Sequence, residues 1–267
     1  MSSQNVSELF SQAVEEGNVS EAAVQTIQLL DAGANIQAAL GVDVEDISAS
    51  DVILVTFMPD DSGSIRTGGN SQIMRDGHNQ ILDALGGSKQ DDSILVHCRY
   101  LNGEILYPYG LLSSAIRMDN HNYNPNKGTP LYDESIILLA SVLAKAQEFA
   151  NNGVPVRTVT AIITDGSDQH SVKAEDRPDM VKIVIDSMLA QENHIVCGVG
   201  IQDNYGTDFE DVFQQMGIMK EWILTPKNDA SEIRAAFDFV SKSAVSASQA
   251  AAGASFSKIA LAGFGDN

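Results

Sequence analysis

The chain has 267 residues, which is the length of one large domain or of one domain with extensions. Hydrophobic residues make up 43% of the sequence, enough to form a sizeable core. Asp and Glu number 36 against 16 Lys and Arg, so the formal net charge is -20 at pH 7. Such a charge repels phosphate backbones and attracts cations, which argues against nucleic acid as a partner.

The sequence shows no sign of export or membrane insertion. It does not open with a charged start followed by an apolar run, so we expect no signal peptide. No stretch approaches the roughly 20 apolar residues that span a bilayer. Cys98 and Cys197 each lie inside an apolar run, and we expect them to be buried, reduced thiols. These features predict a cytoplasmic protein with no membrane partner.

Residues 1–50 are expected to form an N-terminal helical extension, because their apolar residues follow helical spacing. Gly17-Asn18 should end the first helix. Ser20 is placed to cap a second helix, which Gly33 should end, and residues 34–40 would form a short third helix. At the other end of the chain, residues 248–267 are rich in Gly, Ala and Ser. They are expected to be a tail that is partly flexible or docks on another surface.

The main domain is predicted to span residues 51–247, where apolar runs alternate with segments of helical spacing. Strands are expected at 51–58, 93–100, 104–107, 156–163, 194–201 and 221–224, and helices at 70–85, 131–150, 179–191, 209–216 and 230–247. Asn102-Gly103 predicts a tight hairpin, which would make strand 104–107 antiparallel to strand 93–100. The pattern predicts an α/β, doubly wound, Rossmann-like fold with a mostly parallel sheet and one antiparallel edge strand.

Two aspartates follow strands that should lie side by side. In doubly wound sheets, ligands bind beyond the carboxyl ends of the strands, where the strand order reverses. With the common order 3-2-1-4-5-6, the first and fourth strands are neighbours at that point. Asp60 ends the first strand and Asp165 ends the fourth. Two carboxylates that meet in one crevice repel each other unless a cation neutralises them, so the arrangement predicts a metal.

The loop after the first strand supplies further oxygen ligands. Ser62 and Ser64 are two residues apart, so their hydroxyls would face the same side of an extended turn. Gly63 between them would let the loop bend closely around an ion. Hydroxyl and carboxylate oxygens suit Mg²⁺, with Mn²⁺ or Ca²⁺ as alternatives. A site with few charged ligands would keep an open position for an acidic side chain of a partner.

These motifs resemble the metal-ion-dependent adhesion site (MIDAS) of von Willebrand factor A (vWA) domains. Asp60-Asp61-Ser62-Gly63-Ser64 is similar to the family's Asp-x-Ser-x-Ser signature. Thr129 resembles its second element, a threonine that opens the helix after the hairpin. Asp165, in Thr164-Asp165-Gly166, resembles its third. The resemblance covers about residues 51–245 and keeps the family order.

The resemblance implies a role for each residue. Asp60, Ser62, Ser64 and Thr129 would approach the metal directly or through water, and Asp165 mostly through water. Near the end of the chain, Phe237-Asp238-Phe239-Val240-Ser241-Lys242-Ser243 is similar to the closing helix of small bacterial cytoplasmic members of the tellurite-resistance-associated type, which the chain resembles most. Those relatives work beside AAA-type ATPases, kinases or phosphatases in multiprotein systems. The departures are residues 1–50, the tail, and Pro59 directly before the first aspartate.

Other motifs carry weaker signals. The five histidines show no zinc spacing; they are His78, His97, His121, His170 and His194. His170 lies close after Asp165 and could line the rim of the crevice, but we expect it to be a loop residue with no role in the site. The run 203–208 resembles a calcium loop but lacks its final glutamate, so a plain turn is expected. Residues 86–89 lack the spacing of a phosphate loop. Asn126-Lys127 is only a dipeptide match to nucleotide-base binders.

Three functional classes remain open at this level. A metal-dependent binding module that is not an enzyme fits the resemblance. A metal-assisted hydrolase would use a magnesium ion with a free position to polarise an ester, although no base or nucleophile with a partner is evident. A structural or self-assembling subunit would bury the N-terminal helices or the tail on a neighbour.

Overall fold

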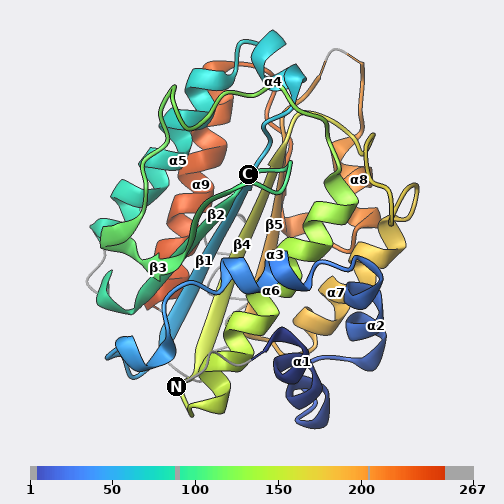
Figure 1. Ribbon diagram of the computed structural model, residues 1–267. Coiled ribbons are helices and arrows are strands. Elements are labelled where there is room, and N and C mark those ends of the chain that lie inside the picture. The colour runs from blue at the N-terminus through green and yellow to red at the C-terminus, as the bar shows by residue number, and fades with distance from the viewer. Residues whose placement is uncertain (1–4, 88–90, 204, 250–267) are drawn as a thin grey trace.

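The computed structural model describes residues 5–87, 91–203 and 205–249. The described chain forms one layered α/β body (Figure 1). Its strands are β1 Val52–Pro59, β2 Ile94–Arg99, β3 Ile105–Leu111, β4 Val156–Thr164, β5 His194–Gly200 and β6 Ile223–Leu224. Its α-helices are α1 Val6–Glu15, α2 Glu21–Leu29, α3 Gly33–Ala39, α4 Gly63–Thr67, α5 Ser71–Gly86, α6 Leu131–Asn151, α7 Pro178–Leu189, α8 Phe209–Gln215 and α9 Ala230–Gln249.

The sheet confirms the predicted topology. Its order is β3-β2-β1-β4-β5-β6, and only the pairing of β2 with β3 is antiparallel among the described strands. Every residue of β1, β2 and β5 is buried, because helices cover both faces. Helices α5 and α9 lie on one face, and α6 and α7 lie on the other (Figure 1).

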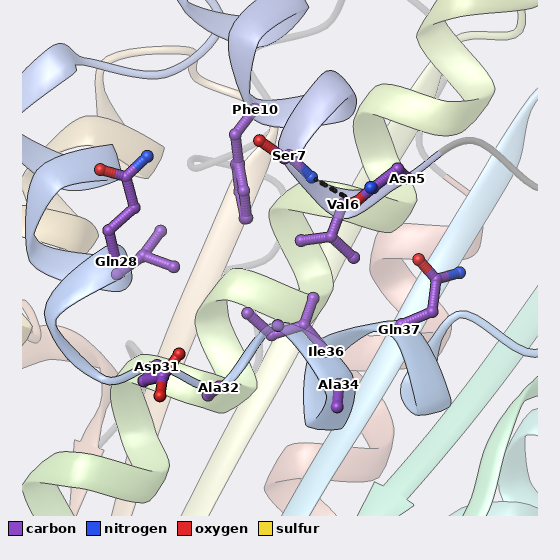
Figure 2. A pocket seen from close by; sticks show the side chains of 12 residues that line it. Asn5, Val6, Ser7, Phe10, Gln28, Asp31, Ala32, Ala34, Ile36 and Gln37 are labelled. Carbon is purple, nitrogen blue, oxygen red and sulfur yellow. Dashed lines mark hydrogen bonds between the residues drawn. The ribbon is translucent and has the colours of Figure 1, made fainter.

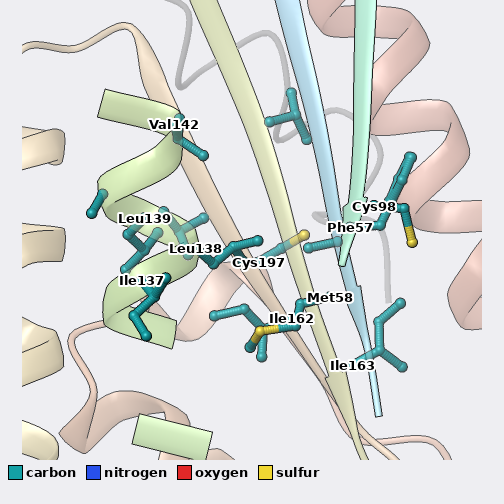
Figure 3. Close-up of a cluster of buried hydrophobic side chains, with 14 of the residues drawn as sticks. Phe57, Met58, Cys98, Ile137, Leu138, Leu139, Val142, Ile162, Ile163 and Cys197 are labelled. Carbon is teal, nitrogen blue, oxygen red and sulfur yellow. The ribbon is translucent and has the colours of Figure 1, made fainter. Parts of the chain in front are cut away.

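The two faces of β1 supply the two halves of the core. Met58 and Ile162 face α6, whose side chains Leu138 and Val142 point toward the strands (Figure 3). Phe57 lies on the other face, where its ring meets His78 of α5 edge to face at 5.9 Å. Cys98 and Cys197 are both buried and free, as the sequence predicts. The described helices include none that is long and apolar enough to cross a membrane.

Helices α1, α2 and α3 form an extra layer over α6 and α7. Their apolar residues, among them Leu9, Ala13 and Ile36, belong to the same buried cluster as the sheet residues. Ser20 accepts a hydrogen bond from the Ala23 amide, which confirms the predicted cap of α2. The three helices also line an open cavity of about 610 Å³, and its side chains include Val6, Phe10 and Ile36 (Figure 2).

The expected boundary at Gly33 is wrong. Helix α2 ends at Leu29, and Gly33 is instead the first residue of α3. The chain reverses at Asp31, whose φ of 51° is left-handed. Asp is among the few residues that adopt this conformation readily, so no glycine is needed there. The break at Gly17, with φ 75°, is confirmed.

The edge strand β3 runs farther than the sequence suggests. We expected it to end at Tyr107, before Pro108, but it continues to Leu111 and pairs with Leu95 and Val96 of β2. Proline lacks the amide hydrogen that a central strand needs, and an edge strand tolerates it because one side has no partner. The hairpin itself is confirmed, and Gly103 takes φ 91° in its turn.

Candidate metal centre

Asp60 lies fully buried where β1 and β4 end side by side. Its backbone amide still pairs with the Ile163 carbonyl at 2.8 Å, so the residue continues the sheet. Its side chain accepts hydrogen bonds from the Ser62 amide at 2.7 Å and from the Thr164 hydroxyl at 2.6 Å. The side-chain position is therefore fixed from both strands.

The two serine hydroxyls converge on Asp165. Ser62 Oγ lies 2.8 Å from Ser64 Oγ, and Ser64 Oγ donates to Asp165 Oδ1 at 2.5 Å. The expected extended turn is wrong, however, because Ser62 precedes helix α4 and Ser64 lies within its first turn. Asp60, Ser62, Ser64 and Asp165 form one connected group, and Ser64 is its solvent-exposed member.

Thr129 reaches the same place from the loop before α6. A Cβ built on Gly166 would lie 3.7 Å from Thr129 Oγ1, so the hydroxyl sits beside the turn that carries Asp165. Thr129 is not the cap of α6. Pro130 occupies the N-cap position, and no side-chain hydrogen bond caps this helix. The structure thus brings all five sequence-predicted residues to one end of the sheet.

His170 holds the Thr129 loop in place, so the expectation that it is loop decoration is wrong. Its Nδ1 accepts a hydrogen bond from the Thr129 amide at 2.8 Å. Its ring also packs on Gly128, where an added Cβ would lie only 2.7 Å from the ring. Its position five residues after Asp165 was the one available signal, and sequence distance alone could not show this contact.

Asp61 anchors the neighbouring loops and was not singled out in the sequence. Its buried side chain accepts from the Asn102 amide at 3.1 Å and from the Asn102 side chain. Its carbonyl accepts from the amides of Asn126, at 2.9 Å, and Lys127, at 3.1 Å. Tyr123 donates its hydroxyl to the Asp60 carbonyl. The hairpin and the loop before Gly128 are therefore both tied to the end of β1.

Asp133 is a second anchor that sequence reasoning missed. It lies in the first turn of α6, and its carboxylate accepts from three consecutive amides, those of Val172, Lys173 and Ala174, at 2.7–3.1 Å. This fixes the chain after Asp165 against the start of α6. The signal, an acidic residue in a first helical turn, is too common to single out from sequence.

Electrostatics at the site favour a bound cation. Burial raises the pKa of Asp60, and it raises the pKa of Asp61 and Asp165 to about 7 each. The charge of Asp60 adds to the effect on both neighbours. Within the described residues, none of these three aspartates forms an ion pair with Lys or Arg. A cation would supply the missing positive charge.

The donor set fits a hard divalent ion. It consists of carboxylate and hydroxyl oxygens, the ligands that Mg²⁺ and Ca²⁺ prefer. The described part of the chain holds no group of three His, Cys, Asp or Glu side chains placed for a metal. A site here would therefore depend on the hydroxyls of Ser62, Ser64 and Thr129 as well as on Asp60 and Asp165.

The weaker motifs do not form sites in the described residues. The Asp203 carboxylate accepts hydrogen bonds from the amide and hydroxyl of Thr207, at 3.0 and 2.5 Å, and from the Tyr205 amide at 3.0 Å. That is the predicted plain turn. His78, His97 and His194 are buried, and burial lowers their pKa values to about 4, 3 and 4. Ser88 and Lys89, of the glycine-rich run, and most of the tail lie outside the described residues.

Comparison with known proteins gives matches among solved structures. No protein-family model matches the sequence, and no curated protein does. The open form of the pilus adhesin SpaC from Lactobacillus rhamnosus GG is 15% identical, with a TM-score of 0.53 over 74% of this chain and 30% of that one. Proximal thread matrix protein 1 of the mussel byssus, with zinc in its MIDAS motif, is 17% identical, with a TM-score of 0.48 over 74% and 47%. A von Willebrand factor type A protein from Catenulispora acidiphila is 16% identical, with a TM-score of 0.44 over 74% and 43%.

The sheet order, the antiparallel edge strand and the helices on both faces decide the architecture. The chain shares this α/β fold with the SpaC adhesin over 74% of its length. It spans less than half the length of each of these three structures. At such low identities the similarity establishes the fold alone, so the metal and its role are argued from the residues of this chain.

Proposed function

We propose that this chain is a vWA-family protein-binding module that captures an acidic side chain of a partner through a divalent cation. Asp60, Ser62, Ser64, Thr129 and Asp165 would hold the ion, as Mg²⁺ or alternatively Mn²⁺ or Ca²⁺. The bound ion would neutralise the buried carboxylates and offer a coordination position to a partner carboxylate.

The proposal is supported by the convergence of oxygen atoms from Ser62, Ser64 and Asp165. Ser62 Oγ, Ser64 Oγ and Asp165 Oδ1 form a continuous chain of contacts at 2.8 and 2.5 Å beside buried Asp60. Ser62 and Ser64 lie at the start of α4, after β1, and Asp165 directly follows β4. Side chains more than 100 residues apart thus present oxygen atoms to one point, where the aspartates lack an ion pair among the described residues.

We extend the proposal to the compartment and the partners of the protein. We infer a cytoplasmic adaptor in a bacterial multiprotein system, with an AAA-type ATPase, a kinase or a phosphatase among its partners and no nucleic acid or membrane. We also infer a binding role rather than an enzymatic one. His170, which contacts the Thr129 loop, supports this because its Nδ1 already accepts a hydrogen bond from the Thr129 amide.

Calorimetric titration of the chain with Mg²⁺, Mn²⁺ and Ca²⁺ tests the metal site. We expect one ion per chain, and we expect loss of binding in Asp60→Ala and Thr129→Ala with the fold retained. Asp46→Ala, an exposed aspartate of the segment before β1, is the matched control and should bind normally. Equal ion binding by Asp60→Ala and the unaltered chain would rule out this site.

A further inference from the structure

Two large apolar side chains stand in solvent on loops beside the candidate metal centre. Tyr205 is 93% exposed and Val172 is 77% exposed, more than any other large apolar residue of the described chain. Val172 lies on the loop that follows β4 and Tyr205 on the loop that follows β5, so both loops leave the carboxyl ends of neighbouring parallel strands. Isolated exposed apolar residues are common, but these two share one end of the molecule with the metal-binding residues.

Hydrogen bonds connect Val172 to the site. His170, two residues earlier, accepts the Thr129 amide at 2.8 Å, and the Gln169 amide donates to the Thr129 carbonyl at 3.1 Å. The Val172 amide donates to the buried carboxylate of Asp133 at 2.7 Å. The backbone of Val172 is thus fixed while its side chain points away from the core.

Tyr205 is held in a similar way on the loop that follows β5. The chain leaving β5 is tied to β4, because the Ile201 amide donates to the Thr164 carbonyl at 2.8 Å, next to Asp165. The Asp203 carboxylate then accepts the amides of Tyr205 and Thr207, both at 3.0 Å. A turn closed by one carboxylate presents the Tyr205 ring to solvent.

We propose that Val172 and Tyr205 select a partner segment in which the metal-binding Asp or Glu is flanked by large apolar side chains. This inference rests on the proposed metal-dependent function of the same site. Exposed apolar side chains on fixed backbones lose little conformational entropy on binding, and tyrosine is enriched among residues that dominate interfaces. The carboxylate would supply the metal contact, and the flanking residues would bury Val172 and Tyr205.

A displayed library of disulfide-closed loops, each with a fixed central Asp and random neighbours, tests the inference. The full chain is loaded with Mg²⁺, and bound loops are eluted with EDTA. We expect large apolar residues beside the Asp to be enriched about tenfold or more. The double variant Val172→Ser/Tyr205→Ser should lose this preference and bind the selected loops about tenfold more weakly. Tyr205→Ser alone should give a smaller loss.

The matched control is Leu29→Ser/Ile116→Ser, which removes two other exposed apolar side chains, at 62% and 48% exposure, outside the loops that follow β4 and β5. It should keep the preference.

Selected loops without apolar neighbours, or an unchanged preference in the Val172/Tyr205 variant, would overturn the inference and leave the metal function standing. A second library with a central Asn in place of Asp gives the background of the selection. If EDTA releases no more loops from the Asp library than from the Asn library, the metal function is overturned as well. A dimer of the unaltered chain that the Val172/Tyr205 variant dissociates would identify a second copy as the occupant and also overturn the inference.

Discussion

The carboxyl end of the sheet and the α1–α3 layer bury different kinds of side chain. At the carboxyl end, Asp60 and Asp61 are withdrawn from water and held by amides and hydroxyls. In the α1–α3 layer, Leu9 and Ile36 are buried among other apolar side chains beside an open cavity. Burying a carboxylate costs free energy, whereas burying a leucine gains it. The helical layer therefore adds to the stability of the fold, whereas the carboxyl end holds buried carboxylates that cost stability, as the proposed binding site requires.

Leu9→Ala should have the largest effect on stability. Leu9 is fully buried in the α1–α3 layer, so its truncation should lower the free energy of unfolding by about 3 kcal/mol. Urea denaturation measures this loss. The affinity for Mg²⁺ at 10 °C should stay within about twofold, because α1 packs against α2, α3 and α6. The control Leu29→Ala, at an exposed position, should change stability by less than about 0.5 kcal/mol. A large loss of Mg²⁺ affinity in Leu9→Ala would show that the α1–α3 layer also affects metal binding at the carboxyl end of the sheet.

Removal of the metal should come next in size, and its effect should depend on pH. At about 100 times its Kd, Mg²⁺ should stabilise the chain by about 2.7 kcal/mol. Burial raises the pKa of Asp165 to about 7 from 3.8, so the metal-free fold favours the protonated carboxyl. That contribution to stability is complete below pH 3.8 and is lost as the pH rises through 7.

Because protons compete with the ion for Asp165, stabilisation by Mg²⁺ should grow between pH 6 and pH 8. Thermal unfolding with Mg²⁺ or EDTA at several pH values measures the difference. Asp60→Ala should show no response to Mg²⁺ at any pH. A response of equal size at pH 5 and pH 8 would contradict this electrostatic account.

Asp133→Ala should lower both the stability of the fold and the affinity for Mg²⁺. Three amides lose their acceptor, so we expect a loss of about 2 kcal/mol in stability. The loop from Asp165 to Ala174 should loosen, and Mg²⁺ affinity should also fall. Asp133→Asn keeps one acceptor oxygen and should lie between the two. Hydrogen exchange of residues 172–174 gives a direct measure, and unchanged protection there would show that Asp133 does not hold the loop.

Gly128→Ala should have the smallest effect of the set. A Cβ would lie 2.7 Å from the His170 ring, so either the ring or the Thr129 backbone must shift. We expect Mg²⁺ affinity to drop severalfold, which corresponds to about 1 kcal/mol. The matched control is Gly33→Ala in α3, because a Cβ there meets nothing within 4 Å. If both variants bind Mg²⁺ alike, His170 does not position Thr129.

The sequence by itself determined most of the architecture. Buried strands such as β1 and β5 are continuous apolar runs, and Asn102-Gly103 specifies a hairpin through local backbone preferences. The placement of Asp60 and Asp165 at strand ends followed from these runs, because parallel neighbours end at the same edge of a sheet. The metal-binding function remains a proposal, although its residues are now known to lie together.

Tertiary structure alone decided which residues support the candidate site. His170 meets Thr129 across 41 positions of sequence, and Asp61 meets Asn102 across the same separation. No periodic pattern encodes such contacts, because they depend on how separate loops fold against one another. The continuation of β3 past Pro108 likewise depended on its place at the sheet edge. Local preferences and hydrophobic period act within a few residues, whereas hydrogen bonds between loops exist only once the sheet has brought those loops together.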